Sequence, residues 1–353
     1  MTERHGRGTP GAGRVPRRVL AHVRTWRVYE SASYGLLGLV GAYTTGSAPG
    51  TPLLVSVWAL CTLGGIGGAY LGDYLGRDGD ALAKPHRPIP SGALSARRAR
   101  TTAALCVTVA AIGGLAHNWR SLIALAVAYG LHMAYHHRLK AYGLVGDLVE
   151  GMATLGGLVL WGAMVAHPSW PPPAVWLVAC AAGLHGTLYN VLLTLTDPEG
   201  DRRAGWRTLP VRHGVRATLL VATVVEACWI LAVVLTWSSG HATTPARAAA
   251  TGLLLGAALV CDIGALRVSL ERRGALRPWH ALDAAQRNLL ARVLACSAFL
   301  AHLADPGPLA LAAGATVLVA ACNRRHLIAR YELGPAHAGP ALAGSGRRRR
   351  RRG

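Results

Sequence analysis

The sequence predicts an all-α membrane protein, a polytopic bundle of nine or ten transmembrane helices around a central cavity. Of its residues, 52% are hydrophobic and only 15% are charged. The apolar residues are gathered in blocks of roughly 15 to 25, the length of a helix that crosses a bilayer. Connectors rich in Arg and Lys alternate with connectors that carry almost none. This pattern excludes a soluble multidomain protein.

The chain begins with a polar segment, residues 1–27, which is rich in Gly and contains seven arginines. It lacks the apolar core and small-residue cleavage site of a signal peptide. We therefore expect an unstructured basic arm on the cytoplasmic side of the membrane.

Residues 28–304 are expected to form one helical domain, and residues 305–353 an extra helix and a basic tail. The apolar segments expected to cross the membrane are residues 29–45, 53–75, 101–116, 122–135, 144–165, 174–195, 217–237, 248–266, 289–303 and 309–322. The loops after the second, fourth, sixth and eighth segments hold the basic residues. By the positive-inside rule, these loops and both termini are expected to be cytoplasmic.

The tail ends in six consecutive arginines, residues 347–352. Such a run is expected to be solvated and to attract anionic lipid. Nucleic-acid binding is disfavoured, because no folded nucleic-acid-binding module accompanies the run.

Two stretches combine acids with bases where an apolar segment ends. They read GDYLGRDGDALAKPHRPIPSGALS (residues 72–95) and DPEGDRRAGWRTLPVRHG (residues 197–214), and they look like a degenerate internal repeat. Mg²⁺ prefers hard oxygen donors and commonly links carboxylates to phosphate oxygens, while Lys and Arg neutralise the remaining charge. Two such loops facing one cavity predict a diphosphate held with magnesium.

The elements KPHRPIPSG and D-x-E-G-D-x-x-x-G-x-x-T-L-P-V resemble those of the UbiA-type superfamily of intramembrane prenyltransferases, over about residues 26–304. The resemblance implies an enzyme that uses Mg²⁺ to ionise a prenyl diphosphate and transfers the prenyl group to a small lipophilic acceptor, typically aromatic. The family's first acidic motif, N-x-x-x-D-x-x-x-D, is altered here. Gly72 stands at the asparagine and Gly76 at the middle aspartate, so only Asp80 is kept.

The resemblance also implies site residues. Asp197 and Asp201 would bind metal at the second motif. At the first motif Asp80 would do so, with Asp73 and the out-of-place Asp78 as candidate substitutes for the missing ligands. The diphosphate ligands would be Lys84, Arg87, Lys140 and Arg202. For Lys140 the alternative is an ordinary lysine at a helix end, whose ammonium group reaches water.

Polar residues within two later apolar segments are candidates for binding or activating the acceptor. Asp147 and Glu150 share one helix face at i,i+3 spacing, and such an ionisable pair could orient an acceptor hydroxyl or act as its base. The alternative is that charge repulsion leaves one of them protonated and merely hydrogen-bonded. His185 and Asn190 are candidates for the acceptor pocket, with a hydrogen-bonded packing role as the alternative for His185.

Two other functions remain open. Some UbiA-like proteins resemble terpene cyclases, in which the double bonds of the substrate itself capture the cation. A non-catalytic or transport protein with the same fold is disfavoured, because scaffolding alone would not need both basic turns and the Asp197/Asp201 pair.

Overall fold

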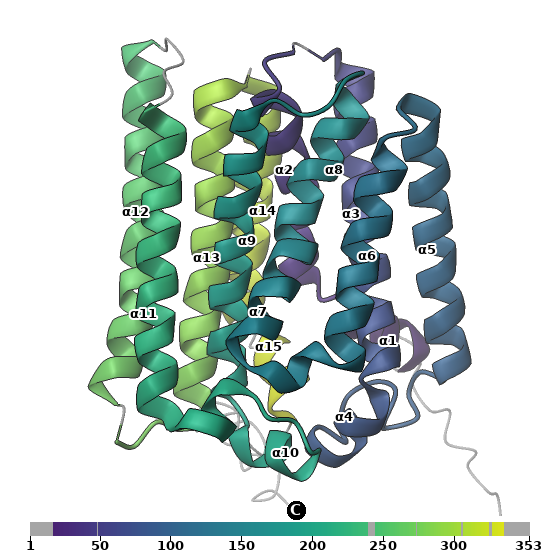
Figure 1. Cartoon of the computed structure of the whole chain (residues 1–353), viewed down its shortest axis with the longest axis vertical. Helices are drawn as coiled ribbons and strands as arrows, with labels where there is room; N and C mark the ends of the chain where they lie inside the picture. The colour runs from purple at the N-terminus through teal and green to yellow at the C-terminus, as the bar shows by residue number, and fades with distance from the viewer. Residues whose placement is uncertain are drawn as a thin grey trace, which may run out of the picture.

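The computed structural model describes residues 17–334 apart from 48, 239–243, 273, 305 and 325–326. Within these residues the chain is helical, without strands, and the helices form an upright bundle (Figure 1). The expected fold class is confirmed. Residues 1–16 and the arginine run 347–352 lie outside the described residues.

Most of the bundle consists of long helices. They are α2 (Val28–Thr44), α3 (Thr51–Leu75), α5 (Ala96–His117), α6 (Ser121–His137), α9 (Pro173–Thr194), α11 (Leu209–Ser238), α12 (Pro245–Glu271), α13 (Pro278–Leu303) and α14 (Pro306–Arg324). A further long element is continuous through α7 (Leu144–Gly151), the π-helical turn η2 (Met152–Gly156) and α8 (Gly157–Ala166). The shorter helices are α1 (Arg17–Thr25), α4 (Arg77–Ala83), η1 (Leu139–Tyr142), α10 (Pro198–Arg203) and α15 (Leu327–Glu332).

Each of the ten predicted apolar segments falls on a helix of the bundle. Six stretches of the described chain are long and apolar enough to cross a membrane: Thr51–Leu75, Ala96–His117, Leu144–Ala166, Pro173–Thr194, Leu209–Trp237 and Pro245–Glu271. A count of nine or ten spans stays a prediction, since the other helices do not meet that criterion.

Three elements differ from the expectation. Helix α13 begins eleven residues before the predicted start at 289, because its first turns carry polar residues that interrupt the apolar pattern. Helix α11 contains a kink at Gly214, whose φ of 77° only glycine adopts easily. The arm was expected to be unstructured, but Arg17–Thr25 is helical, with Ala21 buried and His22 Nδ1 2.6 Å from the Tyr70 hydroxyl.

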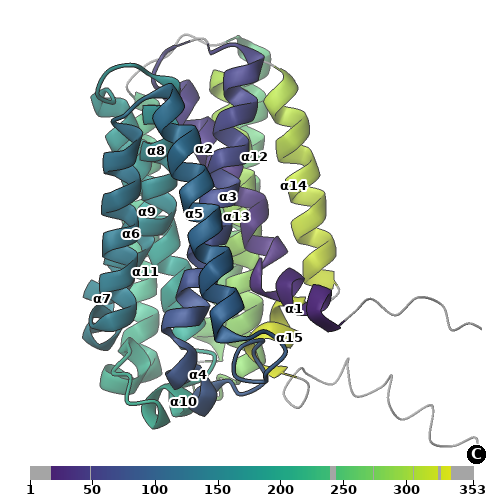
Figure 2. The same ribbon diagram turned by 90° about the vertical axis from the view of Figure 1, so that its right-hand side faces the viewer.

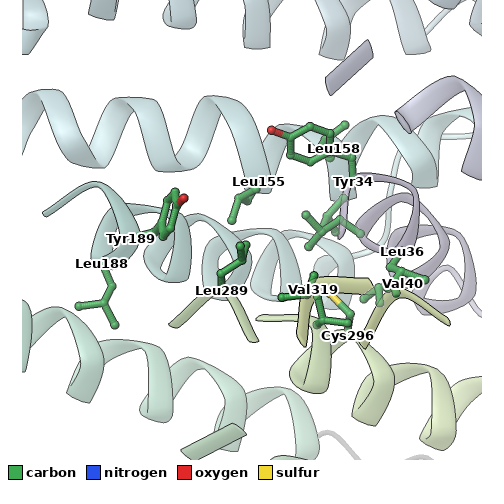
Figure 3. Packing of buried hydrophobic residues seen from close by; sticks show 14 of the residues in the cluster. Tyr34, Leu36, Val40, Leu155, Leu158, Leu188, Tyr189, Leu289, Cys296 and Val319 are labelled. Carbon is green, nitrogen blue, oxygen red and sulfur yellow. The ribbon is translucent and has the colours of Figure 1, made fainter. Parts of the chain in front are cut away.

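Glycines bring α2 and α8 into close contact. A Cβ atom on Gly41 would lie 2.0 Å from the Val159 carbonyl oxygen, and one on Gly162 would lie 2.3 Å from the Gly38 carbonyl oxygen. Small residues at such crossings are how membrane helices approach each other. Figure 3 shows the buried core around this region, including Val40 of α2.

The basic connectors lie together at one end of the bundle. Helices α4 and α10 form this end, and α1 and α15 reach it from the two ends of the described chain (Figures 1 and 2). Helix α4 packs against α10, where the Trp206 ring takes the place that a side chain on Gly79 would occupy. The two acidic stretches therefore meet, as predicted, while their cytoplasmic orientation stays a prediction.

Candidate functional site

A cavity of about 220 Å³ lies inside the bundle and reaches the end formed by α4 and α10. Its wall is apolar along α3, α6 and α8, with Gly64, Ala128, Leu158 and Trp161 among the lining residues. Toward the loops the wall becomes charged. The charged lining residues there are Arg27, Asp80, Lys84, Arg87, Lys140, Asp197, Asp201 and Glu332.

Arg87 links two carboxylates at the charged end. Its Nη1 donates to both oxygens of Asp80, at 3.1 and 2.9 Å, and its Nη2 donates to both oxygens of Glu332, at 3.0 and 2.8 Å. Lys84 also pairs with Glu332. Burial alone would raise the pKa of the Glu332 carboxyl, but Arg87 and Lys84 outweigh it and hold this pKa well below its ordinary value. Glu332 is therefore ionised. It is paired with Arg87 and Lys84, two of the residues predicted to bind the diphosphate.

Asp73 is buried beside this network and is not among the residues that line the cavity. Arg27 Nη2 donates to it at 2.7 Å, and the Tyr331 hydroxyl lies 2.6 Å from each of its oxygens. The predicted metal role of Asp73 stays a prediction, and it would require these partners to move.

The second acidic stretch supplies two carboxylates to the cavity. Asp197 accepts from the Gly200 amide at 2.9 Å and so caps α10, while Asp201 accepts from the Thr208 hydroxyl at 2.9 Å. Each of these hydrogen bonds engages one carboxylate oxygen. Burial raises the pKa of Asp201, and a bound cation would offset that cost. These two carboxylates and that of Asp80, whose oxygens accept from Arg87, are hard oxygen donors of the kind that Mg²⁺ prefers.

Lys140 lines the cavity, with its Nζ 3.0 Å from the centre of the Trp206 ring. Burial lowers the pKa of its ammonium to about 8, although Asp201 and Asp80 act in the opposite direction. Lys140 therefore faces the cavity, and its role as a diphosphate ligand stays a prediction.

Arg202 does not lie where the prediction placed it. Its side chain is 60% exposed, pairs with Glu199 at 3.3 Å and is not among the cavity-lining residues. Successive residues of a helix point about 100° apart, so Arg202 leaves the face on which Asp201 lies. A diphosphate contact from Arg202 is not supported by this geometry.

The structure separates the two candidate acceptor acids. Glu150 lines the cavity and accepts from His132 Nδ1, which lies 2.9 and 3.0 Å from its oxygens. Asp147 is buried outside the cavity lining, and its Oδ2 has no hydrogen-bond partner among the described residues. Three residues along a helix leave two side chains about 60° apart, which is enough to place only one in the cavity.

Asn190 lines the cavity, whereas His185 does not. His185 Nε2 lies 3.1 Å from Asp262 Oδ2 and 3.2 Å from the Asn288 amide nitrogen, and its ring packs edge-on against Trp229. This arrangement agrees with the alternative of a hydrogen-bonded packing residue.

Several residues that line the cavity were not predicted from the sequence. Glu332 is the only carboxylate after Asp305 in the sequence, and that isolation in a basic tail was a usable signal. Glu30, the only acid in the first apolar segment, accepts from the Tyr189 hydroxyl at 2.9 Å. Arg292 also faces the cavity, with its guanidinium 4.7 Å from the centre of the Tyr189 ring.

Several known proteins have sequences similar to this chain. Digeranylgeranylglyceryl phosphate synthase of Pyrococcus furiosus is 26% identical over 291 residues, which cover 82% of this chain and 99% of that protein. The protein of the same name from Methanopyrus kandleri is 37% identical over 158 residues, 45% of this chain and 57% of the relative. The chain thus matches little more than half of the latter.

Solved structures show the same fold. A UbiA homologue from Aeropyrum pernix K1 superposes with a TM-score of 0.63 at 17% identity, covering 78% of this chain and 98% of that one. A UbiA homologue from Archaeoglobus fulgidus bound to DMAPP and Mg²⁺ superposes with a TM-score of 0.52 at 17% identity, covering 63% and 79%. The profile of the UbiA prenyltransferase family matches residues 34–275. Together with the apolar helices, this match means that the chain is an integral membrane protein that belongs to the UbiA prenyltransferase family.

Proposed function

We propose that the protein transfers the prenyl group of a prenyl diphosphate, with Mg²⁺, to an acceptor that bears a glyceryl phosphate group. The observation that carries this proposal is a single cavity whose apolar wall leads to a cluster of carboxylates and cations. An isoprenoid tail partitions to the apolar wall, and its diphosphate belongs at the charged end. The names of the relatives and the ligands of the Archaeoglobus fulgidus homologue support the same chemistry.

The charged end would hold the leaving diphosphate. Asp80, Asp197 and Asp201 would hold magnesium, which when bound neutralises the charge that develops on the diphosphate. Lys140 and Arg87 would donate hydrogen bonds to the diphosphate oxygens, and these bonds are strong in a buried site. The apolar wall would exclude water, which would otherwise capture the allylic cation.

Binding of the diphosphate must displace an anion that belongs to the protein. Arg87 and Lys84 are paired with Glu332, so the substrate would exchange its phosphate oxygens for this carboxylate. Glu332 lies on the short helix α15, which is outside the matched family region.

Arg292 supports an anionic acceptor. This residue of α13 is 4% exposed and lines the cavity, and its Nε and Nη2 have no hydrogen-bond partner in the described part of the chain. A buried guanidinium with two nitrogens that lack acceptors is costly inside a membrane, and the phosphate of a glyceryl phosphate would supply acceptors for them. A neutral aromatic acceptor is typical of the family that the sequence resembles. It would leave the buried nitrogens of Arg292 without acceptors.

The test uses purified protein in lipid nanodiscs with Mg²⁺ and labelled C10 to C20 prenyl diphosphates. We expect product with a prenylglyceryl phosphate acceptor and none with a neutral phenol or without acceptor. Product with the phenol alone would favour an aromatic prenyltransferase, and a terpene formed without acceptor would favour a cyclase. No turnover of any donor would favour the non-catalytic protein.

A further inference from the structure

Two glycines, Gly72 and Gly76, lie at the end of α3 that faces α6. The imidazoles of His132 and His136 fill the space that side chains at these positions would take. A Cβ atom on Gly72 would be 2.9 Å from His136 Nε2 and 3.4 Å from His132 Nε2. A Cβ atom on Gly76 would be 3.8 Å from His136 Nδ1 and 3.9 Å from Asp80 Oδ2. The two Nε2 atoms therefore converge on one point beside the α3 backbone, next to the charged end of the cavity.

The two histidines have the spacing of a metal-binding pair. They are four residues apart on α6, with ring centroids 4.7 Å apart, and both line the cavity. Two histidines at i and i+4 on one helix face are an arrangement by which metalloproteases hold zinc.

Glu150 fixes the orientation of His132. Its two oxygens lie 2.9 and 3.0 Å from His132 Nδ1, so Nδ1 is the nitrogen that donates to the carboxylate and Nε2 is the nitrogen left for a metal ion. His132 is 7% exposed, and its buried Nε2 has no hydrogen-bond partner among the described residues. A carboxylate that holds one ring nitrogen while the other nitrogen is left to a metal ion is typical of metal-bound histidine.

The three side chains are close enough to share one ion. One ligand-capable atom from each of His132, His136 and Glu150 can be chosen so that all lie within 4.8 Å of one another. We propose that His132 and His136, braced by Glu150, form a binding site for a transition-metal ion of the Zn²⁺ or Co²⁺ class. Imidazole nitrogens suit these ions, whereas Mg²⁺ prefers oxygen. The site is separate from the oxygen donors assigned to Mg²⁺ and does not depend on the proposed function.

The binding of such an ion can be measured without any reaction. The full-length protein, purified with a histidine-free tag and stripped with a chelator, is titrated with Zn²⁺ by calorimetry and with Co²⁺ by visible absorption. Millimolar Mg²⁺ is present throughout to occupy the carboxylates. We expect one tightly bound ion per chain, with the absorption of nitrogen-ligated Co²⁺.

Matched variants locate the ion. His136→Gln and His132→Gln remove a ligand, and each is expected to weaken binding by more than the loss of an outer partner, which costs about 10-fold to 100-fold. Glu150→Gln should give that smaller loss. His137→Gln is the control, because His137 is exposed on the same helix. Gly72→Ala removes no ligand, yet its methyl group would crowd both Nε2 atoms and should also weaken binding.

Three outcomes would overturn the proposal. They are no Zn²⁺ or Co²⁺ binding by the wild type, equal binding by wild type and His136→Gln, and equal binding by wild type and Gly72→Ala. If His132 instead served as a proton acceptor braced by Glu150, His132→Gln would slow turnover in stripped protein and leave Zn²⁺ binding unchanged. Thermal melting of each variant identifies loss of folding, and Gly72→Ala keeps the test valid if a histidine variant does not fold.

Discussion

The carboxylate of Glu332 accepts two hydrogen bonds from the guanidinium of Arg87, a residue 245 positions earlier in the chain. The same guanidinium holds Asp80 on its other side. A short C-terminal helix thereby places an anion among the cations that the proposed function assigns to a diphosphate.

Glu332→Gln should lower the KM for the prenyl diphosphate. The variant removes the competing charge, and a hydrogen bond to a charged group contributes on the order of 1 to 2 kcal/mol, so we expect a decrease of about 5-fold to 30-fold. Initial rates against donor concentration measure it. Glu271→Gln, an exposed acid on α12, is the control. An unchanged or higher KM would show that Glu332 does not compete with the donor.

The affinity for the donor should fall in alkaline solution through Lys140. Because burial lowers the pKa of Lys140 to about 8, the free enzyme loses this positive charge as pH rises through that value. The KM for the prenyl diphosphate should then rise by up to about 10-fold per pH unit. Lys140→Arg stays charged and should flatten the profile. Parallel pH profiles for wild type and variant would contradict the assignment.

Asp201→Asn should lower turnover by about 100-fold or more, since it removes a carboxylate that stabilises charge on the leaving group. Glu199→Gln alters an exposed acid two residues away on α10 and should turn over like the wild type. Rates at saturating donor and Mg²⁺ measure both. Equal rates for Asp201→Asn and wild type would remove Asp201 from the site.

Arg292→Met should raise the KM for the glyceryl phosphate acceptor by about 10-fold or more while the KM for the donor stays constant. Arg287→Met is matched to it, because Arg287 lies on the same helix but is partly exposed and paired with Asp283 at 3.0 Å. If the two variants behave alike, Arg292 does not bind the acceptor.

The bundle could be predicted because each span is a local property of the sequence. A run of apolar residues predicts its own helix. The similar composition of the two acidic stretches predicted that they would lie together. Glu332 could not be placed in this way, because its partners lie some 245 residues away and no local pattern encodes that contact.

The direction in which each side chain points was the second property of the site that could not be predicted from the sequence. His185 and Asn190 lie on one helix, yet packing against α12 and α13 turns the first to Asp262 and leaves the second in the cavity. Arg202 and Asp201 are neighbours in sequence but differ in burial. The pattern of residue types predicted which helices carry polar groups, but not which neighbour each group meets.

The contact between Arg27 and Tyr331 joins residues 304 positions apart, and both also bind Asp73. Since a membrane protein is synthesised and folds from its N-terminus onward, Asp73, Lys84 and Arg87 are in place well before residue 332 leaves the ribosome. Until then the two cations have no Glu332 to neutralise them. The charged end of the cavity is thus completed only when α15 is made, and a nascent chain released before that point would already contain every long helix of the described residues.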